Sequence, residues 1–343
     1  MNLADLNKVA LAMVAPGKGL LAADESTGTI KKRFDDINVV STEDSRRDYR
    51  EMLFRTSEAM RQYISGVILY DETIWQNAGD GTPLIRLIEQ TGAIPGIKVD
   101  EGTQALPACP GERVTIGLDN LAGGLKKYYD RGARFAKWRA VIDIGGDKIP
   151  TMTAIHVNAH ALARYAALCQ EAQIVPIVEP EVLMDGDHDI DRCYEVTERV
   201  LNKTFQELRI QRVALEGMIL KPNMVVPGKK SAKQVAVDEI AEKTIRLLKT
   251  CVPAAVPGIA FLSGGQSDVD ATANLDAMNR IGHLPWRLSF SYGRALQAAP
   301  QKAWLGRPEN IAAGQQAFNH RARMNSLATK GEWQPDLEAK KAA

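Results

Sequence analysis

Ionisable residues interrupt several short apolar runs of this sequence, each close to the end of its run. They are Asp24, Lys98, Lys137, Arg139, Glu179, Glu181, Lys221 and Arg294. A charged side chain in an apolar strand costs several kcal/mol unless it is paired, so this placement needs a reason. Lys137 and Arg139 are two residues apart, as are Glu179 and Glu181. Each pair therefore points to one side of its strand.

If these sets face inward, three lysines, two arginines and three carboxylates share one cavity. An ordinary lysine has a pKa of about 10.4, and both burial and neighbouring cations lower that value. A shift to near 7 would take about 4–5 kcal/mol, part of which a second lysine could supply. The product is a nucleophilic amine that can condense with a ketone, and Lys221 is the candidate. The alternative is a ring of structural ion pairs closing the top of a barrel.

Two segments have the composition of phosphate sites. The first contains Ser263, Gly264 and Gly265 at the start of a helix, and the second ends in Gly293 and Arg294. Adjacent glycines let backbone N–H groups approach an anion, a helix amino terminus favours negative charge, and a guanidinium can bind phosphate through two hydrogen bonds. The alternative is an ordinary glycine-rich turn.

A second anionic group fits residues 24–29, where hydroxyls follow the first apolar run and Lys32 and Arg33 come soon after. A capped helix start with a solvated basic turn explains this pattern equally well.

Eight apolar runs must position these residues. They span 19–24, 66–71, 94–100, 134–143, 174–182, 215–222, 258–265 and 287–294. The segments between them have helical spacing, as in 41–64, 190–208 and 231–250, and capping-box patterns at Ser41/Asp44 and Ser267/Asp270. This alternation predicts an α/β protein, a single-domain (β/α)8 TIM barrel with chemistry at the carboxyl ends of its strands, with a doubly wound open sheet as the main rival. An N-terminal helix over about 3–15 and a short C-terminal tail over about 320–343 complete the expected domain.

Composition narrows the class of protein. The 343 residues carry a net charge of +1 and are 45% hydrophobic. With no basic block and no apolar stretch of about 18 residues, we expect neither nucleic acid nor a membrane as partner. Four scattered cysteines are typical of reduced thiols in a cytoplasmic protein.

No metal and no cofactor are expected. None of the five histidines stands at the carboxyl end of a run. His156 and His160, four residues apart, favour a surface or packing role in a helix. The series Asp185, Asp187, Asp189 hints at a calcium loop, but the positions for its glycine and glutamate hold other residues.

These motifs together resemble the class I fructose-bisphosphate aldolases. The segments that resemble the family, in its order, are APGKGLLAADESTGTI, GVILYDET, GIKVDEG, FAKWR, IVPIVEPEVL, LEGMILKPNMV, FLSGGQS and FSYGRALQAA. They span roughly residues 15–305. The resemblance implies the barrel fold and reversible cleavage of fructose 1,6-bisphosphate in glycolysis or gluconeogenesis, without a metal.

The resemblance also implies roles for residues that match the family's motifs. Lys221 matches the lysine that forms the Schiff base, Glu179 the acid/base that dehydrates the carbinolamine, and Asp24 the carboxylate near the C4 hydroxyl. Lys137 and Glu181 match groups that assist this network. Ser263, Gly264, Gly265 and Arg294 correspond to the C1-phosphate site, and Ser26, Thr29, Lys98 and Arg33 to contacts near the C6 phosphate and sugar. Arg46 and Arg139 correspond to further basic positions.

The sequence also departs from the family. Thr29 stands where the best-known members have serine, Asp143 replaces a lysine, and the carboxyl terminus has no terminal tyrosine. The last change leaves open the preference between fructose 1,6-bisphosphate and fructose 1-phosphate. The family is commonly tetrameric, so a homotetramer is expected. The alternatives are another Schiff-base barrel, such as a transaldolase-like or dehydratase-like lyase, and a non-catalytic scaffold.

Overall fold

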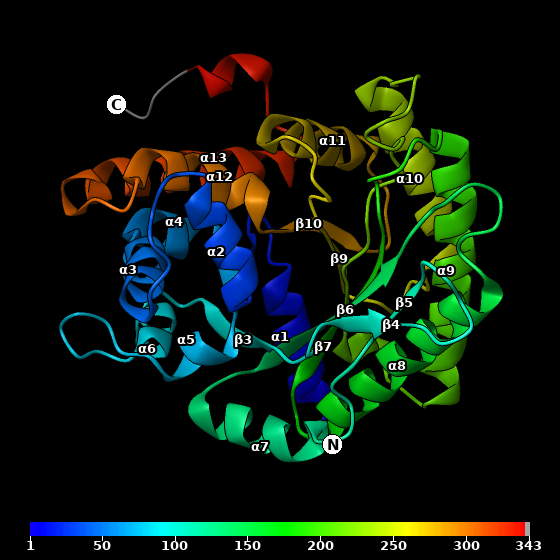
Figure 1. The fold of residues 1–343 in the computed structure, drawn as a ribbon, viewed down its shortest axis with the longest axis horizontal. Helices are drawn as coiled ribbons and strands as arrows, with labels where there is room; N and C mark the ends of the chain where they lie inside the picture. The colour runs from blue at the N-terminus through cyan, green and yellow to red at the C-terminus, as the bar shows by residue number, and fades with distance from the viewer. Residues whose placement is uncertain (340–343) are drawn as a thin grey trace.

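Eight parallel strands close into a barrel with helices around it (Figure 1). This computed structural model describes residues 1–339. The strands follow the order β1-β10-β9-β8-β7-β6-β3-β2 around the barrel. Their bounds are β1 Gly19–Ala23, β2 Ile64–Leu69, β3 Ile94–Lys98, β6 Phe135–Ile142, β7 Val175–Val182, β8 Ile219–Leu220, β9 Gly258–Phe261 and β10 Arg287–Tyr292. The predicted (β/α)8 TIM barrel is confirmed, and the open-sheet rival is excluded.

Helices connect the strands along the outside, with α8 to α10 on the right of Figure 1 and α11 to α13 across the top. The helices are α1 Leu3–Met13, α2 Thr27–Asp35, α3 Glu43–Phe54, α4 Ser57–Gln62, α5 Asp71–Trp75, α6 Leu84–Glu89, α7 Leu121–Arg131, α8 Met152–Glu171, α9 Ile190–Ile210, α10 Val237–Cys251, α11 Asp268–Ile281, α12 Arg294–Trp304 and α13 Ile311–Ala328. An antiparallel hairpin of β4 Thr103–Ala105 and β5 Arg113–Thr115 follows β3. Short 3-10 helices are η1 Leu215–Gly217, η2 Pro308–Asn310 and η3 Pro335–Glu338.

Alternate residues of each strand face opposite sides of the barrel wall. In β7, Val175 and Ile177 belong to the apolar cluster inside the barrel, whereas Val178 packs with the residues under the helices. In β6, Phe135 is inside and Trp138 is outside. Because side chains alternate with a period of two, the charged residues that follow at the inward spacing point into the barrel.

The N-terminal helix α1 closes the amino end of the barrel. It lies in the stretch where the sequence predicts a helix, and the Asn2 side chain caps its first turn. Leu6, Ala10 and Met13 are buried and join the same inner cluster as Ile177 of β7 and Ala260 of β9. Burial of this apolar face against the strand interiors stabilises one end of the barrel and leaves the other end for polar residues.

The capping box predicted at Ser41/Asp44 is wrong by one residue. The Thr42 hydroxyl accepts from the Ser45 N–H at 3.1 Å, and the Ser45 hydroxyl accepts from the Thr42 N–H at 2.9 Å. The Ser41 hydroxyl accepts from Arg46 instead, at 3.3 Å. The box predicted at Ser267/Asp270 is present in half: the Ser267 hydroxyl accepts from the Asp270 N–H.

The helix predicted over 41–64 is broken into α3 and α4. The Thr56 hydroxyl donates to the Met52 carbonyl at 3.0 Å, so a side chain competes with the helix ladder at this point. Ile64, predicted on the helix, is the first residue of β2.

Residues 320–339, which belong to the predicted C-terminal tail, pack against the rest of the protein. Helix α13 runs to Ala328, and its Arg321 is only 3% exposed. Arg321 forms an ion pair with Glu338 and donates to the Thr272 hydroxyl at 2.7 Å. The Trp333 N–H donates to Asp276 at 2.8 Å. The rest of the predicted tail, residues 340–343, lies outside the described residues.

Candidate active site

A cavity of about 1100 Å³ opens at the carboxyl end of the barrel. It is lined by residues that the sequence singles out on seven different strands or the loops after them. They are Asp24, Ser26, Thr29, Arg33, Lys98, Lys137, Arg139, Glu179, Glu181, Lys221, Ser263, Gly264, Gly293 and Arg294. The predicted convergence of these side chains is therefore confirmed, while their individual roles stay predictions.

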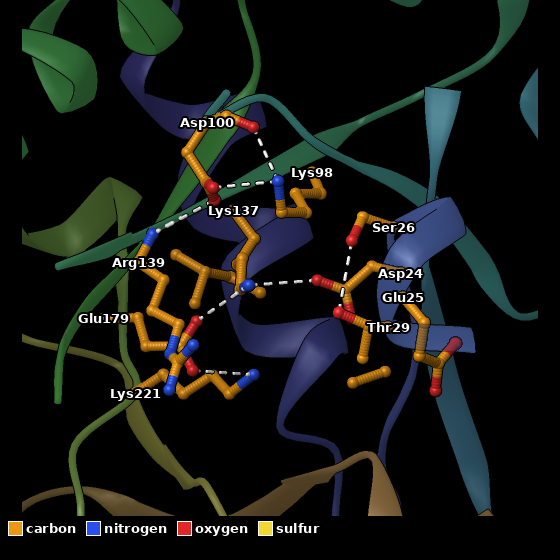
Figure 2. Close-up of polar contacts among 12 residues, drawn as sticks. Asp24, Glu25, Ser26, Thr29, Lys98, Asp100, Lys137, Arg139, Glu179 and Lys221 are labelled. Atoms are coloured by element: carbon orange, nitrogen blue, oxygen red, sulfur yellow. Dashed lines mark hydrogen bonds and ion pairs between the residues drawn. The ribbon is translucent and has the colours of Figure 1, made fainter. Parts of the chain in front are cut away.

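A chain of four charged side chains crosses the cavity (Figure 2). Lys137 Nζ lies 2.9 Å from Asp24 Oδ2 and 3.2 Å from Glu179 Oε2. The other oxygen of Glu179 lies 3.1 Å from Lys221 Nζ. All four side chains are 12% exposed or less. Lys137 and Lys221 thus share the buried carboxylate of Glu179, and Lys137 also contacts the carboxylate of Asp24.

Strand register produces this arrangement. Lys98 of β3 pairs with Lys137 of β6, and Arg139 of β6 pairs with Glu179 of β7. The Lys221 N–H donates to the carbonyl of Val178, which continues the ladder beyond β8. Paired residues of neighbouring parallel strands point to the same side of the barrel wall. The strand register therefore sets the position of each of these side chains along the barrel axis.

Burial and neighbouring charges shift the pKa values of Asp24 and Lys137 in opposite directions. Burial alone would raise the pKa of Asp24, but Lys137 and then Lys221 outweigh it and hold the pKa well below its usual range. Burial would lower the pKa of Lys137, but Asp24 and Glu179 raise it far above its usual value. Asp24 is therefore a carboxylate and Lys137 an ammonium at neutral pH.

Two further ion pairs hold the cationic side of the cavity. Arg139 forms an ion pair with Glu181, and Lys98 Nζ lies 2.8 Å from Asp100 Oδ1. The second oxygen of Asp100 accepts from the Arg139 N–H at 3.4 Å. Each cation is thus fixed by a carboxylate while it still borders the cavity.

On the opposite side, buried Glu25 orients Arg33. Arg33 forms an ion pair with Glu25, which is 6% exposed. Gln297 donates to the same carboxylate oxygen at 2.8 Å, and Arg50 donates to the Glu25 carbonyl at 2.8 Å. These contacts also fix the backbone directly after Asp24, the first charged residue at the end of β1.

The loops after β9 and β10 present unused hydrogen-bond donors. Gly264 and Gly265 have φ of 58° and 88°, a left-handed conformation that favours glycine. Within residues 1–339 their N–H groups donate no hydrogen bond, and the Arg294 side chain makes no ion pair or hydrogen bond. The buried Ser291 hydroxyl also has no partner in this part of the chain. This arrangement suits an anion rather than an ordinary turn.

Two predicted residues, Arg46 and Gly265, lie outside the cavity lining. Arg46 is buried on α3, where its Nε donates to Glu72 of α5 at 2.9 Å. Its guanidinium is therefore occupied by a carboxylate and is not presented to the cavity. Gly265 stands just behind Gly264, beside Arg294.

Sequence reasoning missed Glu25, Asp100 and Ser291 in this site. Asp100 follows Lys98 at the inward spacing of two, and Ser291 precedes Gly293 in the same way. The alternation that found Lys137 and Arg139 could have found both. Glu25 had no such signal, because it lies beyond the end of β1 and its burial depends on Arg33, Arg50 and Gln297.

The histidine pair is not part of the cavity lining, whereas Asp185 of the aspartate series borders the cavity. His156 and His160 of α8 both approach Glu207 of α9, at 3.4 and 3.2 Å. Asp185 forms an ion pair with Lys229. Among residues 1–339, no group of three or more histidine, cysteine or acidic side chains is arranged to hold a metal ion. In the same range, no helix is both long enough and apolar enough to cross a membrane.

The comparisons with known proteins agree with this geometry. The chain is 56% identical to the probable fructose-bisphosphate aldolase class 1 of Xanthomonas campestris pv. campestris, over 97% of the chain and 99% of that protein. It is 54% identical to the cytosolic fructose-bisphosphate aldolase 4 of Arabidopsis thaliana, over 94% and 82% of the two chains. The structure matches that of fructose-bisphosphate aldolase from Plasmodium falciparum, solved with TRAP and a small-molecule inhibitor, with a TM-score of 0.95 and 46% identity over 97% and 96% of the chains.

A family model described as class-I fructose-bisphosphate aldolase, glycolytic, matches residues 5–343. The relatives are enzymes, which excludes the reading of the barrel as a non-catalytic scaffold. The barrel and the charged cavity at its carboxyl end agree with these matches. The chain belongs to the class I fructose-bisphosphate aldolase family.

Proposed function

We propose that this protein cleaves fructose 1,6-bisphosphate reversibly to dihydroxyacetone phosphate and glyceraldehyde 3-phosphate, through a Schiff base on Lys221. One observation carries this proposal. The Lys221 amine lies 3.1 Å from the Glu179 carboxylate, which Lys137 connects to Asp24. Nucleophile, acid/base and second base thus stand in one buried row. The names of the relatives support the choice of substrate.

Formation of the Schiff base uses the contact between Lys221 and Glu179. Lys221 transfers a proton to Glu179, and the free amine attacks the C2 ketone of the open-chain sugar. The carbinolamine then loses its hydroxyl as water when Glu179 returns the proton. The resulting iminium is an electron sink, so the following step does not expel a bare carbanion.

Cleavage starts at Asp24. Asp24 accepts the proton of the C4 hydroxyl, the C4 oxygen forms a carbonyl, and the electrons of the C3–C4 bond move into the iminium to give an enamine. Glyceraldehyde 3-phosphate leaves. Protonation of the enamine at C3 and hydrolysis of the imine release dihydroxyacetone phosphate and free Lys221.

The pKa of Asp24 constrains this step. A carboxylate held this far below its usual pKa by Lys137 is fully ionised but binds a proton weakly. The contact with Lys137 must therefore lengthen as the C4 hydroxyl arrives, or Asp24 must pass the proton on quickly. Lys137, which stays protonated, balances charge throughout.

The two phosphates fit opposite sides of the cavity. The unused donors of Gly264, Gly265 and Arg294, with Ser263, bind the C1 phosphate, close to Lys221. Ser26 and Thr29, whose hydroxyls are 3.1 Å apart, contact the C6 end together with Lys98 and Arg33. Arg46 is not part of this proposal, because Glu72 occupies its side chain.

Borohydride reduction in the presence of dihydroxyacetone phosphate tests the mechanism. Mass spectrometry is expected to find one reduced adduct, on Lys221. Lys221→Met abolishes both adduct and turnover, while Lys203→Met, which removes a lysine from an outer ion pair with Glu207, changes neither. Turnover of the bisphosphate by Lys221→Met would refute the proposal, and different products would identify another Schiff-base lyase.

The same proposal extends to the setting of the enzyme. We infer a single-domain, metal-independent, cytoplasmic enzyme of glycolysis and gluconeogenesis, assembled as a homotetramer like the family it belongs to. Light scattering should give four times the mass of the chain, and a monomer would refute the tetramer. Activity that EDTA abolishes and zinc restores would refute metal independence.

A further inference from the structure

The segment after β8 is fixed against the loop after β7. The Gly228 N–H donates to the His188 carbonyl at 2.8 Å, and the Lys229 N–H donates to the Met184 carbonyl at 2.7 Å. A Cβ at Gly228 would overlap the carbonyl oxygen of Gly186, so the two loops can approach this closely only with glycine there. Lys229 therefore leaves the backbone from a defined point between the loops after β7 and β9.

The Lys229 side chain reaches the phosphate loop of β9. A Cβ built on Gly265 would lie 2.5 Å from Lys229 Nζ and 2.9 Å from Arg294 Nη2. The two cationic nitrogens thus both lie beside Gly265, the residue after Gly264, and are at most about 5.4 Å apart. A single phosphate group can accept hydrogen bonds from two cations at such a separation.

In the described residues Lys229 has one ionic partner, which is solvent-exposed. Lys229 Nζ lies 2.7 Å from Asp185 Oδ1, and the Asp185 side chain is 63% exposed. A solvent-exposed ion pair is weak, so the lysine can exchange this carboxylate for a doubly charged phosphate at little cost. Asp185 thus holds the ammonium next to the loop when no anion is present.

We propose that Lys229 is a further binding residue for the phosphate held by the loops after β9 and β10. The inference rests on the proposed function, since it assigns a second cation to the same phosphate. Arg294 supplies a planar guanidinium that fixes the orientation of the phosphate, and Lys229 adds a mobile point charge on the other side. Lys229 contacts substrate only through this phosphate, so it acts on binding more than on the bond-breaking steps.

Calorimetric titration with dihydroxyacetone phosphate and with inorganic phosphate tests the proposal. Loss of one charge-assisted hydrogen bond predicts that Lys229→Met raises Kd about tenfold. KM for the bisphosphate should rise by a similar factor while kcat changes little. Lys229→Arg should restore most of the affinity. Lys230→Met, which removes the adjacent exposed lysine, is the matched control and should bind like the unmodified protein.

Asp185→Asn separates binding from loop support. If Lys229 binds phosphate, releasing it from Asp185 leaves affinity unchanged or higher. If the Lys229–Asp185 pair only holds the loop, Asp185→Asn and Lys229→Met weaken binding equally, which overturns the proposal. An unchanged Kd in Lys229→Met, beside a raised Kd in Arg294→Met, overturns it too. The borohydride adduct on Lys221 reports separately on the proposed function, because it forms at saturating ligand in every one of these variants if the mechanism holds.

Discussion

Replacing Lys137 by methionine tests how strongly the buried charges depend on one another. These charges, the charge row, are those of Lys221, Glu179, Lys137 and Asp24, in the order in which they contact each other. Methionine keeps most of the apolar stem and removes the ammonium that contacts Asp24 at 2.9 Å and Glu179 at 3.2 Å. At an effective dielectric constant of about 20, each contact amounts to about 5 kcal/mol of attraction, most of which desolvation offsets. The net cost comes from the carboxylate left behind.

Asp24 is that carboxylate, because Glu179 keeps Lys221 as a partner. Breaking a buried pair by removing one partner costs about 3–5 kcal/mol, a large part of a typical stability of about 5–15 kcal/mol. Loss of a preorganised charge should lower kcat about 10²- to 10³-fold. Lys126→Met is the control: it removes a lysine from an exposed pair with Asp130 and should cost less than about 1 kcal/mol.

The pH dependence gives the sign of the effect. In the unmodified protein the pKa of Asp24 is depressed, so its stabilising contribution is complete above the unfolded value near 3.8 and is lost as pH falls below it. Without Lys137, burial dominates and the pKa of Asp24 rises above the unfolded value. The folded variant then binds more protons than the unfolded chain, and its stability increases as pH falls from about 7 to about 5.

Urea unfolding at several pH values, with Asp24→Asn as the second arm of a double-mutant cycle, measures this. The double variant should be more stable than Lys137→Met and still inactive, with a coupling free energy of about 1–3 kcal/mol. A loss of less than about 1 kcal/mol in Lys137→Met would contradict the reasoning. A stability of this variant that stays constant between about pH 7 and pH 5 would contradict it too. Either outcome would mean that water already screens the charges of Asp24, Lys137 and Glu179 from one another.

Three substitutions away from the charge row should act on stability, each measured by urea unfolding. Gly228→Ala should cost about 1–3 kcal/mol, because its methyl overlaps the Gly186 carbonyl, and a neutral result would show that the loops separate easily. Asn223→Ala should cost about 1–3 kcal/mol, since the last N–H of β7 loses its buried acceptor; an unchanged midpoint would mean that water replaces it. Glu338→Ala should lower the urea midpoint, because buried Arg321 loses its close ion pair and keeps only a 3.8 Å contact with Asp268 and its hydrogen bonds. Burial would raise the pKa of Glu338, but Arg321, Trp333 and His320 together lower it. The difference from the unmodified protein should therefore shrink as pH falls below about 4.5, and a difference independent of pH would rule out the ion pair as its cause.

The barrel and the facing of its charged residues could be predicted because both depend on short-range patterns. A period of two along β6 and β7 placed Lys137 and Glu179 on the inner wall. Eight apolar runs separated by helical segments predicted closure. The motif resemblance placed most of the substrate-binding residues in one cavity.

Contacts between distant elements could not be predicted in this way. Arg46 was expected among the substrate contacts, but Glu72 occupies it, and nothing in the spacing of α3 shows that α5 brings a carboxylate there. The end of the chain, predicted only as a short tail, packs against α11. Its burial depends on Arg321 and Glu338 meeting across a turn, which no periodicity encodes.

The apolar seal that α1 forms under the barrel has a kinetic consequence. Because Leu6, Ala10 and Met13 fill that end, the cavity is closed at the amino end of the barrel. Substrate and products pass through its opening at the carboxyl end. Under the proposed mechanism, the aldehyde fragment leaves by the route along which the hexose enters, and the water that hydrolyses the imine enters by the same route. The order of release in that mechanism, aldehyde first and dihydroxyacetone phosphate second, is then imposed by this shared route as well as by the covalent bond to Lys221.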